Sequence, residues 1–359
     1  MTSPVSAGRT TLSVGRAVPG EQPRTSFGRH APALEVRDLS VEFRTRGGWL
    51  RVVDDVSFSV EPGSTMGLVG ETGSGKTVTS LAAMGLMPDL NGRTPTGSVM
   101  VDGVDLLQLD RRELQDVRGN RISMIFQQAI RSLNPAYSVG DQIAEVARRH
   151  LDLPRREAWK LAVEMLDRVH IASAGRRARE YPHTFSGGMC QRVAIAMALV
   201  CKPRVLIADE PTTALDVTVQ ARILDLLREL QAENDLAIVF ITHDLGVVSE
   251  ICDSAAVMYA GQIVERTPSA QLFRRPRHPY TEGLLASLPQ VDQGKRLVAI
   301  RGSVPPLDAL PGGCRFHPRC DYARAGTCNR EEPLVRDVGG GVVSRCIRAD
   351  ELDLKGLAG

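Results

Sequence analysis

The chain has 359 residues, of which 43% are hydrophobic, enough for one large domain with a substantial core and an appendage. Its 44 Lys and Arg nearly balance its 42 Asp and Glu, so charge alone does not indicate a nucleic-acid partner or an anionic membrane surface. No apolar run approaches the roughly 18–20 residues that cross a bilayer, and the N-terminus has no apolar signal core. We therefore expect a cytoplasmic protein that reaches a membrane only through partners.

Residues 1–32 differ in composition from the rest of the chain. They are rich in Gly, Pro, Ser, Thr and Arg and contain a single acid, Glu21. Such a segment cannot bury a core, so it is predicted to be a disordered, solvated arm.

From Leu34 onward the pattern is that of alternating strands and helices. LEVRDLSVEF and VVDDVSFSV alternate as strands do, and four short apolar runs follow at 66–70, 122–126, 205–208 and 237–242. Continuous apolar runs are typical of parallel strands buried on both faces. Between the second and third runs, residues 156–171 keep one helical face apolar. This order predicts an α/β fold with a mostly parallel sheet and a helical insertion.

A glycine-rich loop joins the first apolar run to a helix expected to begin near Lys76. Its sequence, GETGSGKT, has the spacing of a phosphate-binding P-loop, in which backbone N–H groups and a helix N-terminus surround phosphate oxygens. Lys76 is expected to reach the β- and γ-phosphates of ATP, and the Thr77 hydroxyl to bind Mg²⁺. The predicted nucleotide-binding residues are Gly70, Glu71, Thr72, Gly73, Ser74, Gly75, Lys76 and Thr77.

The third apolar run ends in two acids, Asp209 and Glu210. Ligands of open α/β sheets bind at the carboxyl ends of strands, and the spacing allows this strand to lie beside that of the P-loop. Asp209 is expected to hold Mg²⁺, and Glu210 to polarise the water that attacks the γ-phosphate.

With these motifs in place, the chain resembles the ABC ATPase family over roughly residues 34–350. Ser186, Gly187 and Gly188 open a helix and resemble the family's signature loop, which would face a phosphate as the P-loop does. The resemblance implies an ABC-type ATPase domain over residues 33–289, with a mostly parallel core sheet, an antiparallel β subdomain and a helical subdomain. A small Cys-rich module over residues 290–359 would follow.

Further residues match the family in order along the chain. The resemblance implies that Gln127 senses Mg²⁺ and the attacking water, and that His243 contacts the γ-phosphate. Ala214-Leu215-Asp216 matches the loop at the seam between two ATPase domains. Phe43 is the candidate for stacking on adenine, with Trp49 as the competing choice.

Within the family, the chain is most similar to the ATPase subunits of oligopeptide and dipeptide importers, with nickel importers close by. The segment RHPYTEGLLASLP (277–289), the Q-loop region FQQAIRSLNP and the tail GCRFHPRC carry this similarity. Two departures stand at Gln128-Ala129, where Asp-Pro is usual, and at Cys190, where Arg is more typical. Neither affects a predicted catalytic role, but both bear on the surface that faces a partner.

The resemblance also implies the assembly. Two ATPase subunits would meet head to tail, each ATP lying between one P-loop and the other subunit's signature serine, and closure would drive transport through two integral membrane permeases. The second ATPase would be a related chain or a copy, and an extracytoplasmic binding protein would deliver a peptide. The expected location is the cytoplasmic face of the cell membrane, as a peripheral subunit.

Four of the seven cysteines gather near the end, with spacings of five, seven and 17 residues between them. They lack the paired C-x2-C knuckles of common zinc sites, and four thiolates on irregular loops suit an iron–sulfur cluster. The resemblance also points to a [4Fe–4S] cluster, with zinc as the alternative. The predicted ligands are Cys314, Cys320, Cys328 and Cys346.

Other functions stay open at this stage. The importer could carry nickel or another small solute, or the chain could be an ABC ATPase of DNA repair or of the ribosome. The long coiled coils of the repair type and the second ATPase domain of the ribosomal type are not seen in this sequence. The arginines of the tail could also mark a nucleic-acid-binding zinc module, but acids intersperse them and only Phe316 and Tyr322 are aromatic. We therefore expect no nucleic-acid partner.

Overall fold

The computed structural model describes residues 31–213, 215–288 and 299–357. Pro32–Gly359 forms one compact unit. The predicted arm, apart from its last two residues, lies outside the described residues, as do Ala214 and the expected boundary at residue 290. No helix in the described ranges is long and apolar enough to cross a membrane.

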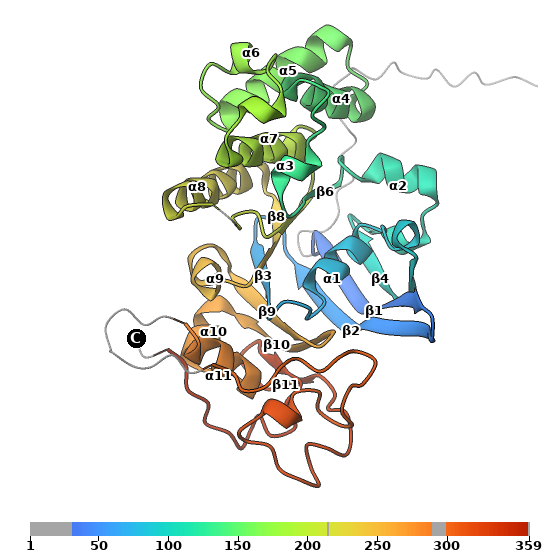
Figure 1. The fold of residues 1–359 in the computed structure, drawn as a ribbon, viewed down its shortest axis with the longest axis vertical. Coiled ribbons are helices and arrows are strands. Elements are labelled where there is room, and N and C mark those ends of the chain that lie inside the picture. The colour runs from blue at the N-terminus through green and yellow to red at the C-terminus, as the bar shows by residue number, and fades with distance from the viewer. Residues whose placement is uncertain (1–30, 214, 289–298, 358–359) are drawn as a thin grey trace, which may run out of the picture. The chain divides into compact units, whose positions relative to one another are not determined.

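An antiparallel sheet of four strands begins the unit (Figure 1). Its order is β2-β1-β4-β5, and the inward side chains of its strands are apolar and buried. The strands are β1 (Leu34–Thr45), β2 (Gly48–Val60), β4 (Gly92–Val101) and β5 (Val104–Asp105).

The second sheet is mixed and has the order β11-β12-β10-β9-β3-β8-β7-β6. The five strands from β9 to β6 run parallel to one another, and the other three add on in antiparallel fashion at the β9 edge. The strands are β3 (Thr65–Val69), β6 (Ile122–Ile125), β7 (Val205–Asp209), β8 (Ala237–Thr242), β9 (Ser254–Tyr259), β10 (Gln262–Pro268), β11 (Arg336–Asp337) and β12 (Val343–Ser344). The sequence allowed β7 to lie beside β3, but β8 lies between them.

Helices connect these strands and build the insertion between β6 and β7 (Figure 1, top). In the insertion, α4, α5 and α7 pack together, and α5 buries the expected face through Ala158, Ala162, Met165 and Leu166. The α-helices are α1 (Lys76–Ala83), α2 (Arg111–Val117), α3 (Ala129–Ser132), α4 (Val139–Leu151), α5 (Arg155–Arg168), α6 (Ala174–Arg177), α7 (Gly187–Leu199), α8 (Val217–Asn234), α9 (Leu245–Ile251), α10 (Ser269–Arg274) and α11 (Pro279–Ala286). The 3-10 helices are η1 (Pro88–Leu90), η2 (Leu106–Gln108), η3 (Pro182–Thr184) and η4 (His317–Arg319).

The parallel strands are covered on both faces. On β8, Ile238 and Phe240 belong to a core shared with α7 and α8, whereas Val239 and Ile241 belong to a core shared with β1, β2 and α1. This explains why the strands read as continuous apolar runs. Because β6, β7 and β8 are parallel neighbours, their carboxyl ends meet at one edge of the sheet, where the predicted catalytic residues follow.

Residues 299–357, here named the C-terminal segment, hold little regular structure. Phe316 is its largest buried apolar side chain, and β12 pairs with β10 to extend the central sheet. Three arginines of the segment, Arg315, Arg319 and Arg345, form ion pairs with acids of the ATPase portion. The segment is thus attached by ion pairs, by strand pairing and by apolar packing of Phe316 on the main core.

Candidate functional site

The P-loop lies between β3 and α1, as its sequence predicts. Gly73 and Gly75 have left-handed φ angles of 83° and 106°, and a Cβ on Gly70 would collide with the Met258 carbonyl oxygen. Gly75 caps α1 without any side-chain hydrogen bond to the first turn. The N–H groups at the start of α1 are therefore available to an anion.

Lys76 is 7% exposed, and its amine lies inside the curve of the loop. Nζ donates to the carbonyl oxygens of Gly70 at 2.7 Å and of Glu71 at 3.0 Å. Burial lowers the pKa of Lys76, whereas the nearby carboxylates of Glu210, Asp209 and Glu71 oppose that shift. A cation surrounded by carbonyls and acids at this position can neutralise a phosphate bound in the loop.

Thr77 and Asp209 meet at the carboxyl end of β7. The Thr77 hydroxyl donates to Asp209 Oδ1 at 3.4 Å, and Asp209 is only 1% exposed. Burial raises the pKa of Asp209, and the neighbouring Glu210 adds to this shift, while Thr77 and Lys76 oppose it. A hydroxyl and a buried carboxylate are oxygen donors of the type that Mg²⁺ prefers, so these two residues fit the expected ion.

Glu210 is the centre of a cluster of polar side chains from three strand ends. Its carboxylate accepts from Gln127 Nε2 at 2.7 Å and Thr213 Oγ1 at 3.0 Å, and lies 3.1 Å from His243 Nδ1. Burial alone would raise the pKa of Glu210, but the hydrogen bonds from His243 and Thr213 outweigh it and lower the pKa. The structure thus brings Gln127 and His243 together around the ionised carboxylate of Glu210.

Thr213 is a member of this cluster that the sequence analysis missed. Its position three residues after Glu210 allows the chain to turn back, and Thr213 N–H donates to the Glu210 carbonyl at 3.2 Å. A hydroxyl residue shortly after the acidic strand end was the available signal.

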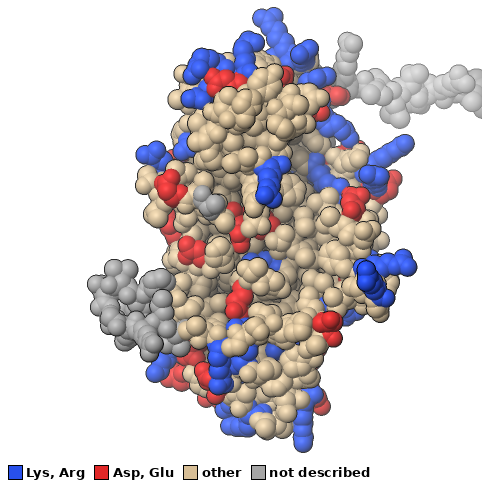
Figure 2. Space-filling model, viewed as in Figure 1, with Lys and Arg blue, Asp and Glu red and all other residues tan. Residues whose placement is uncertain are grey.

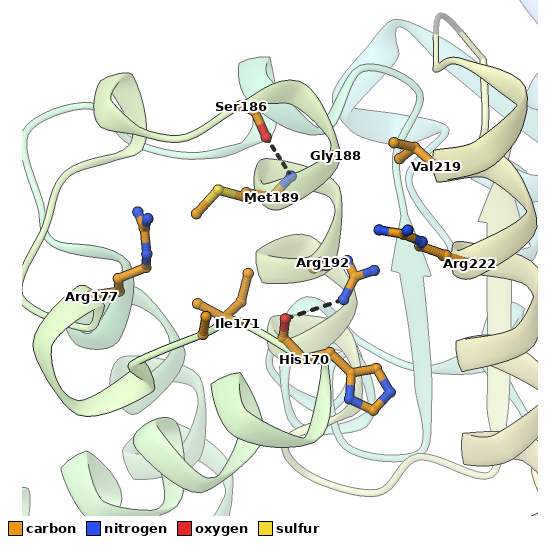
Figure 3. A pocket seen from close by; sticks show the side chains of 10 residues that line it. His170, Ile171, Arg177, Ser186, Gly188, Met189, Arg192, Val219 and Arg222 are labelled. Atoms are coloured by element: carbon orange, nitrogen blue, oxygen red, sulfur yellow. Dashed lines mark hydrogen bonds between the residues drawn. The ribbon is translucent and has the colours of Figure 1, made fainter.

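The signature loop opens α7. Ser186 is the N-cap and its hydroxyl accepts from Met189 N–H, while a Cβ on Gly188 would lie 2.7 Å from Val219 on α8. Ser186 and Gly188 line a cavity of about 300 Å³. Arg177, Arg192 and Arg222 surround the same cavity (Figure 3), which gives this face a positive charge. Within the described residues, no hydrogen bond of Ser186 reaches the P-loop or Glu210.

Asp216 caps α8, accepting from Val219 N–H at 2.9 Å. Its predicted place at a seam between subunits is not tested within one chain.

Phe43 is half-buried on β1, between Leu50 of β2 and Gly92 of β4. The competing aromatic, Trp49, is exposed, and the Arg93 guanidinium lies 4.0 Å from its ring centroid. Because Arg93 covers one face of Trp49, we retain Phe43 as the predicted adenine contact.

The four cysteines near the end of the chain are free thiols on loops of the C-terminal segment. Burial raises the pKa of Cys320 to about 12, and the thiols of Cys314, Cys346 and Cys328 add to this shift because they lie nearby. In the described ranges, no group of three or more His, Cys, Asp or Glu side chains is arranged to hold a metal ion.

The Arg324 N–H donates to the Cys328 sulfur at 3.4 Å. Hydrogen bonds to the sulfurs are among the features that set the properties of an iron–sulfur cluster. Four nearby thiols are a donor set that both such a cluster and zinc accept.

The arginines of the C-terminal segment turn largely inward or pair with acids. Arg315 pairs with Asp54 and Glu332, and Arg345 with Asp55. On the face shown in Figure 2, blue and red side chains are interspersed over the C-terminal segment, without a basic stripe. On this face, the charges therefore form no continuous basic surface of the kind that a nucleic-acid-binding tail would present.

Comparisons with known proteins agree with this geometry. The family described as ABC transporter matches residues 53–213, and the oligopeptide/dipeptide transporter C-terminal region matches residues 264–328. A "Putative peptide import ATP-binding protein" of Brucella abortus is 52% identical over 317 residues, covering 88% of this chain and 95% of that protein. Another of Brucella melitensis is 50% identical over 333 residues, covering 89% and 98%.

Solved structures show the same fold. The dimeric ATP-binding cassette MJ0796, in a post-hydrolysis state with ADP and phosphate, matches with a TM-score of 0.59 and 25% identity, over 66% of this chain and 98% of that chain. The protein cbiO1 from Clostridium perfringens, part of the ABC transporter complex cbiONQ, matches with a TM-score of 0.57 and 26% identity, over 67% and 90%.

These findings confirm the family and the expected α/β architecture of the ATPase portion. The chain belongs to the ABC transporter ATP-binding family and is an ATP-hydrolysing transporter subunit that carries the oligopeptide/dipeptide transporter C-terminal region.

Proposed function

We propose that this subunit powers the import of peptides from the cytoplasmic face of the membrane. The observation that carries the ATPase part is the Glu210 carboxylate, held by Gln127, Thr213 and His243 beside the P-loop lysine. The peptide part is supported by the names of the relatives and by the match to the oligopeptide/dipeptide transporter C-terminal region.

In the proposed reaction, the P-loop N–H groups and Lys76 hold the phosphates of ATP. Glu210 accepts a proton from the water that attacks the γ-phosphorus, the bond to ADP breaks, and phosphate is released. Gln127 and His243 orient the Glu210 carboxylate and the water through the contacts at 2.7 and 3.1 Å. Mg²⁺ held by Thr77 and Asp209 supplies charge neutralisation on the phosphate oxygens.

The site is proposed to be completed by a second ATPase subunit. Ser186 makes no hydrogen bond to the P-loop of its own chain, yet it lies at a helix N-terminus beside an arginine-lined cavity suited to an anion. MJ0796, which has the same fold, is dimeric. The proposed complex therefore contains a second, related ATPase chain or a copy, two permeases, and a binding protein outside the membrane.

Affinity purification of the chain from its own solubilised membranes, followed by mass spectrometry, tests this proposal. Recovery of two multi-spanning permeases and a second ATPase supports the importer. The associated binding protein can then be tested with peptides and with nickel, and a preference for nickel would contradict peptide import. Recovery of ribosomes or repair factors without permeases would contradict transport.

We also propose that the four cysteines hold a [4Fe–4S] cluster. Their nearby thiols, and the Arg324 N–H that donates to the Cys328 sulfur at 3.4 Å, support this assignment. The cluster would be structural, tying together loops that share little apolar core. Anaerobic purification should give a brown protein with iron and sulfide, and a Cys320→Ser variant should lose both. A colourless protein with zinc and no iron would contradict the cluster.

A further inference from the structure

The residue after the first glycine of the P-loop, Glu71, is held by two residues from near the end of the chain. Its carboxylate accepts from Arg319 at 2.7 and 3.0 Å, in a two-pronged ion pair. Its backbone N–H donates to the Tyr280 hydroxyl at 2.9 Å. Arg319 follows Glu71 by 248 residues and Tyr280 follows it by 209.

Arg319 is itself fixed in place. It is 5% exposed, its Nε donates to the Arg301 carbonyl at 2.9 Å, and its guanidinium lies 5.7 Å from the Tyr259 ring and 5.9 Å from the Phe316 ring. A planar guanidinium that lies against aromatic rings and bonds two carboxylate oxygens is held in one orientation. Arg319 can therefore hold the Glu71 carboxylate in a fixed place.

Tyr280 is equally constrained, because it is fully buried in an aromatic cluster. The ring of Tyr259 lies 4.7 Å from that of Tyr280, and Phe316 lies 5.2 and 5.3 Å from Tyr259 and Tyr280. The cluster joins the end of β9, the start of α11 and the C-terminal segment. The C-terminal part of the chain thus presents a rigid surface to the P-loop.

This contact acts on the loop in two ways. The contact fixes the P-loop backbone at Glu71, next to Gly70, where the N–H groups of the loop must point at phosphate. It also neutralises a carboxylate that would otherwise repel phosphate, because Arg319 pairs with Glu71. Lys76 donates to the Glu71 carbonyl, so a shift of Glu71 would move the lysine's partner as well.

We propose that Arg319 is a positioning residue for ATP binding. With Tyr280 it braces the P-loop through Glu71, so that the C-terminal part of the chain sets nucleotide affinity. In this proposal, Arg319 acts on nucleotide binding through its ion pair with Glu71.

The test measures ATP affinity by calorimetry, and KM and kcat for ATP hydrolysis, on the full chain carrying Arg319→Met. We expect affinity to fall and KM to rise by roughly tenfold or more, with kcat at saturating ATP little changed. Arg319→Lys keeps the charge but not the fork, and should recover part of the affinity. Loss of kcat at unchanged KM would overturn the proposal.

The matched control is Arg345→Met, in the same segment. Arg345 is as buried as Arg319, pairs with Asp55 at 2.9 Å and donates to the carbonyls of Ile263 and Pro333, none of which belongs to the P-loop. It should lower the melting temperature without changing ATP affinity. Equal losses of affinity in the two variants would mean that Arg319 acts only through general stability.

Two further variants keep the proposal testable. Glu71→Gln added to Arg319→Met removes the unpaired carboxylate and should recover only the part of the affinity that its repulsion of phosphate had cost. A lack of any recovery would contradict the electrostatic part, and full recovery would contradict the bracing part. If Arg319→Met does not fold, Tyr280→Phe removes only the hydroxyl that accepts from Glu71 N–H. Weaker ATP binding by that variant supports the brace, and unchanged binding overturns it.

Discussion

Two glutamates near the P-loop lysine are held in opposite ways. Glu210 is held by an amide, a hydroxyl and an imidazole, and its partner His243 has a side chain that is 59% exposed. Glu71 is held by a buried arginine and by a tyrosine hydroxyl on its own N–H. One carboxylate is therefore held by hydrogen bonds from an amide, a hydroxyl and an imidazole, whereas the other is paired with a guanidinium that carries a full positive charge.

The difference separates two tasks of a carboxylate beside phosphate. A base must accept a proton and exchange partners, so weak donors that orient it serve better than a permanent cation, which would lower its basicity. A loop anchor must not move, and a two-pronged arginine supplies both rigidity and charge balance. The partners of each glutamate thus indicate its task.

The largest expected effect comes from removing the carboxylate of Glu210, the proposed base. Glu210→Gln should lower kcat by about 10²–10⁴-fold, because the amide cannot accept the proton of the attacking water. Nucleotide binding should persist, since the P-loop and Lys76 are untouched, and ATP should trap a closed pair of subunits. Single-turnover hydrolysis and ATP binding measured on the same sample check this, and near-normal turnover would remove Glu210 from the role of base.

Lys76 lies near both glutamates, and its replacement should have the second-largest effect, a loss of ATP affinity. Lys76→Ala removes the buried cation that donates to the Glu71 carbonyl, and should weaken ATP binding on the order of 100-fold. Equilibrium titration with ATP measures the change. Lys160→Ala, on the exposed face of α5, is the control and should bind ATP as the unaltered chain does. Normal affinity of Lys76→Ala would refute the P-loop assignment.

The smallest expected effect is a change in thermal stability, and it concerns a third glutamate. This residue, Glu265, bonds the chain just before the helix whose Tyr280 contacts Glu71. Glu265 on β10 accepts from Arg277 N–H at 2.9 Å, just before the helix that carries Tyr280, and burial raises its pKa to about 7. Because the folded state holds this proton more tightly than the unfolded state, the contribution of Glu265 to stability is full at acid pH and is lost as pH rises through about 7.

Glu265→Gln mimics the protonated form and should remove that loss. Its melting temperature should exceed that of the unaltered chain by a margin that grows from pH 5 to pH 8. Thermal unfolding at both pH values measures this, with Glu164→Gln on the exposed face of α5 as the control. A margin that does not change with pH would show that Glu265 is not the group responsible.

Local motifs and the family resemblance were sufficient to predict Gln127, Glu210 and His243 as site residues, but not Thr213. Gln127, Glu210 and His243 each follow a short apolar run, and parallel strands bring such ends to one edge of a sheet. The order of the strands was less accessible, because spacing alone does not reveal that β8 lies between β3 and β7. The contacts that Ser186 would make with a second subunit likewise do not follow from the sequence of one chain.

The anchor of Glu71 could not be predicted in this way. Arg319 lies in a segment without hydrophobic periodicity, and nothing local distinguishes it from Arg315, whose partners are different. In the sequence, the segments RHPYTEGLLASLP and GCRFHPRC indicate only a subfamily. That they supply Tyr280, Phe316 and Arg319 to one cluster at the P-loop follows only from their packing.

The separation of 248 residues between Glu71 and Arg319 also corresponds to a delay during synthesis of the chain. A ribosome adds roughly 5–20 residues per second, so the P-loop precedes its anchor by about 12–50 s. The two strands that flank the P-loop strand, β8 and β9, are also made late in that interval. Under the proposed role of Arg319, ATP would add its full stabilisation only once this arginine is in place, which would make the nucleotide a late partner in the folding of this subunit.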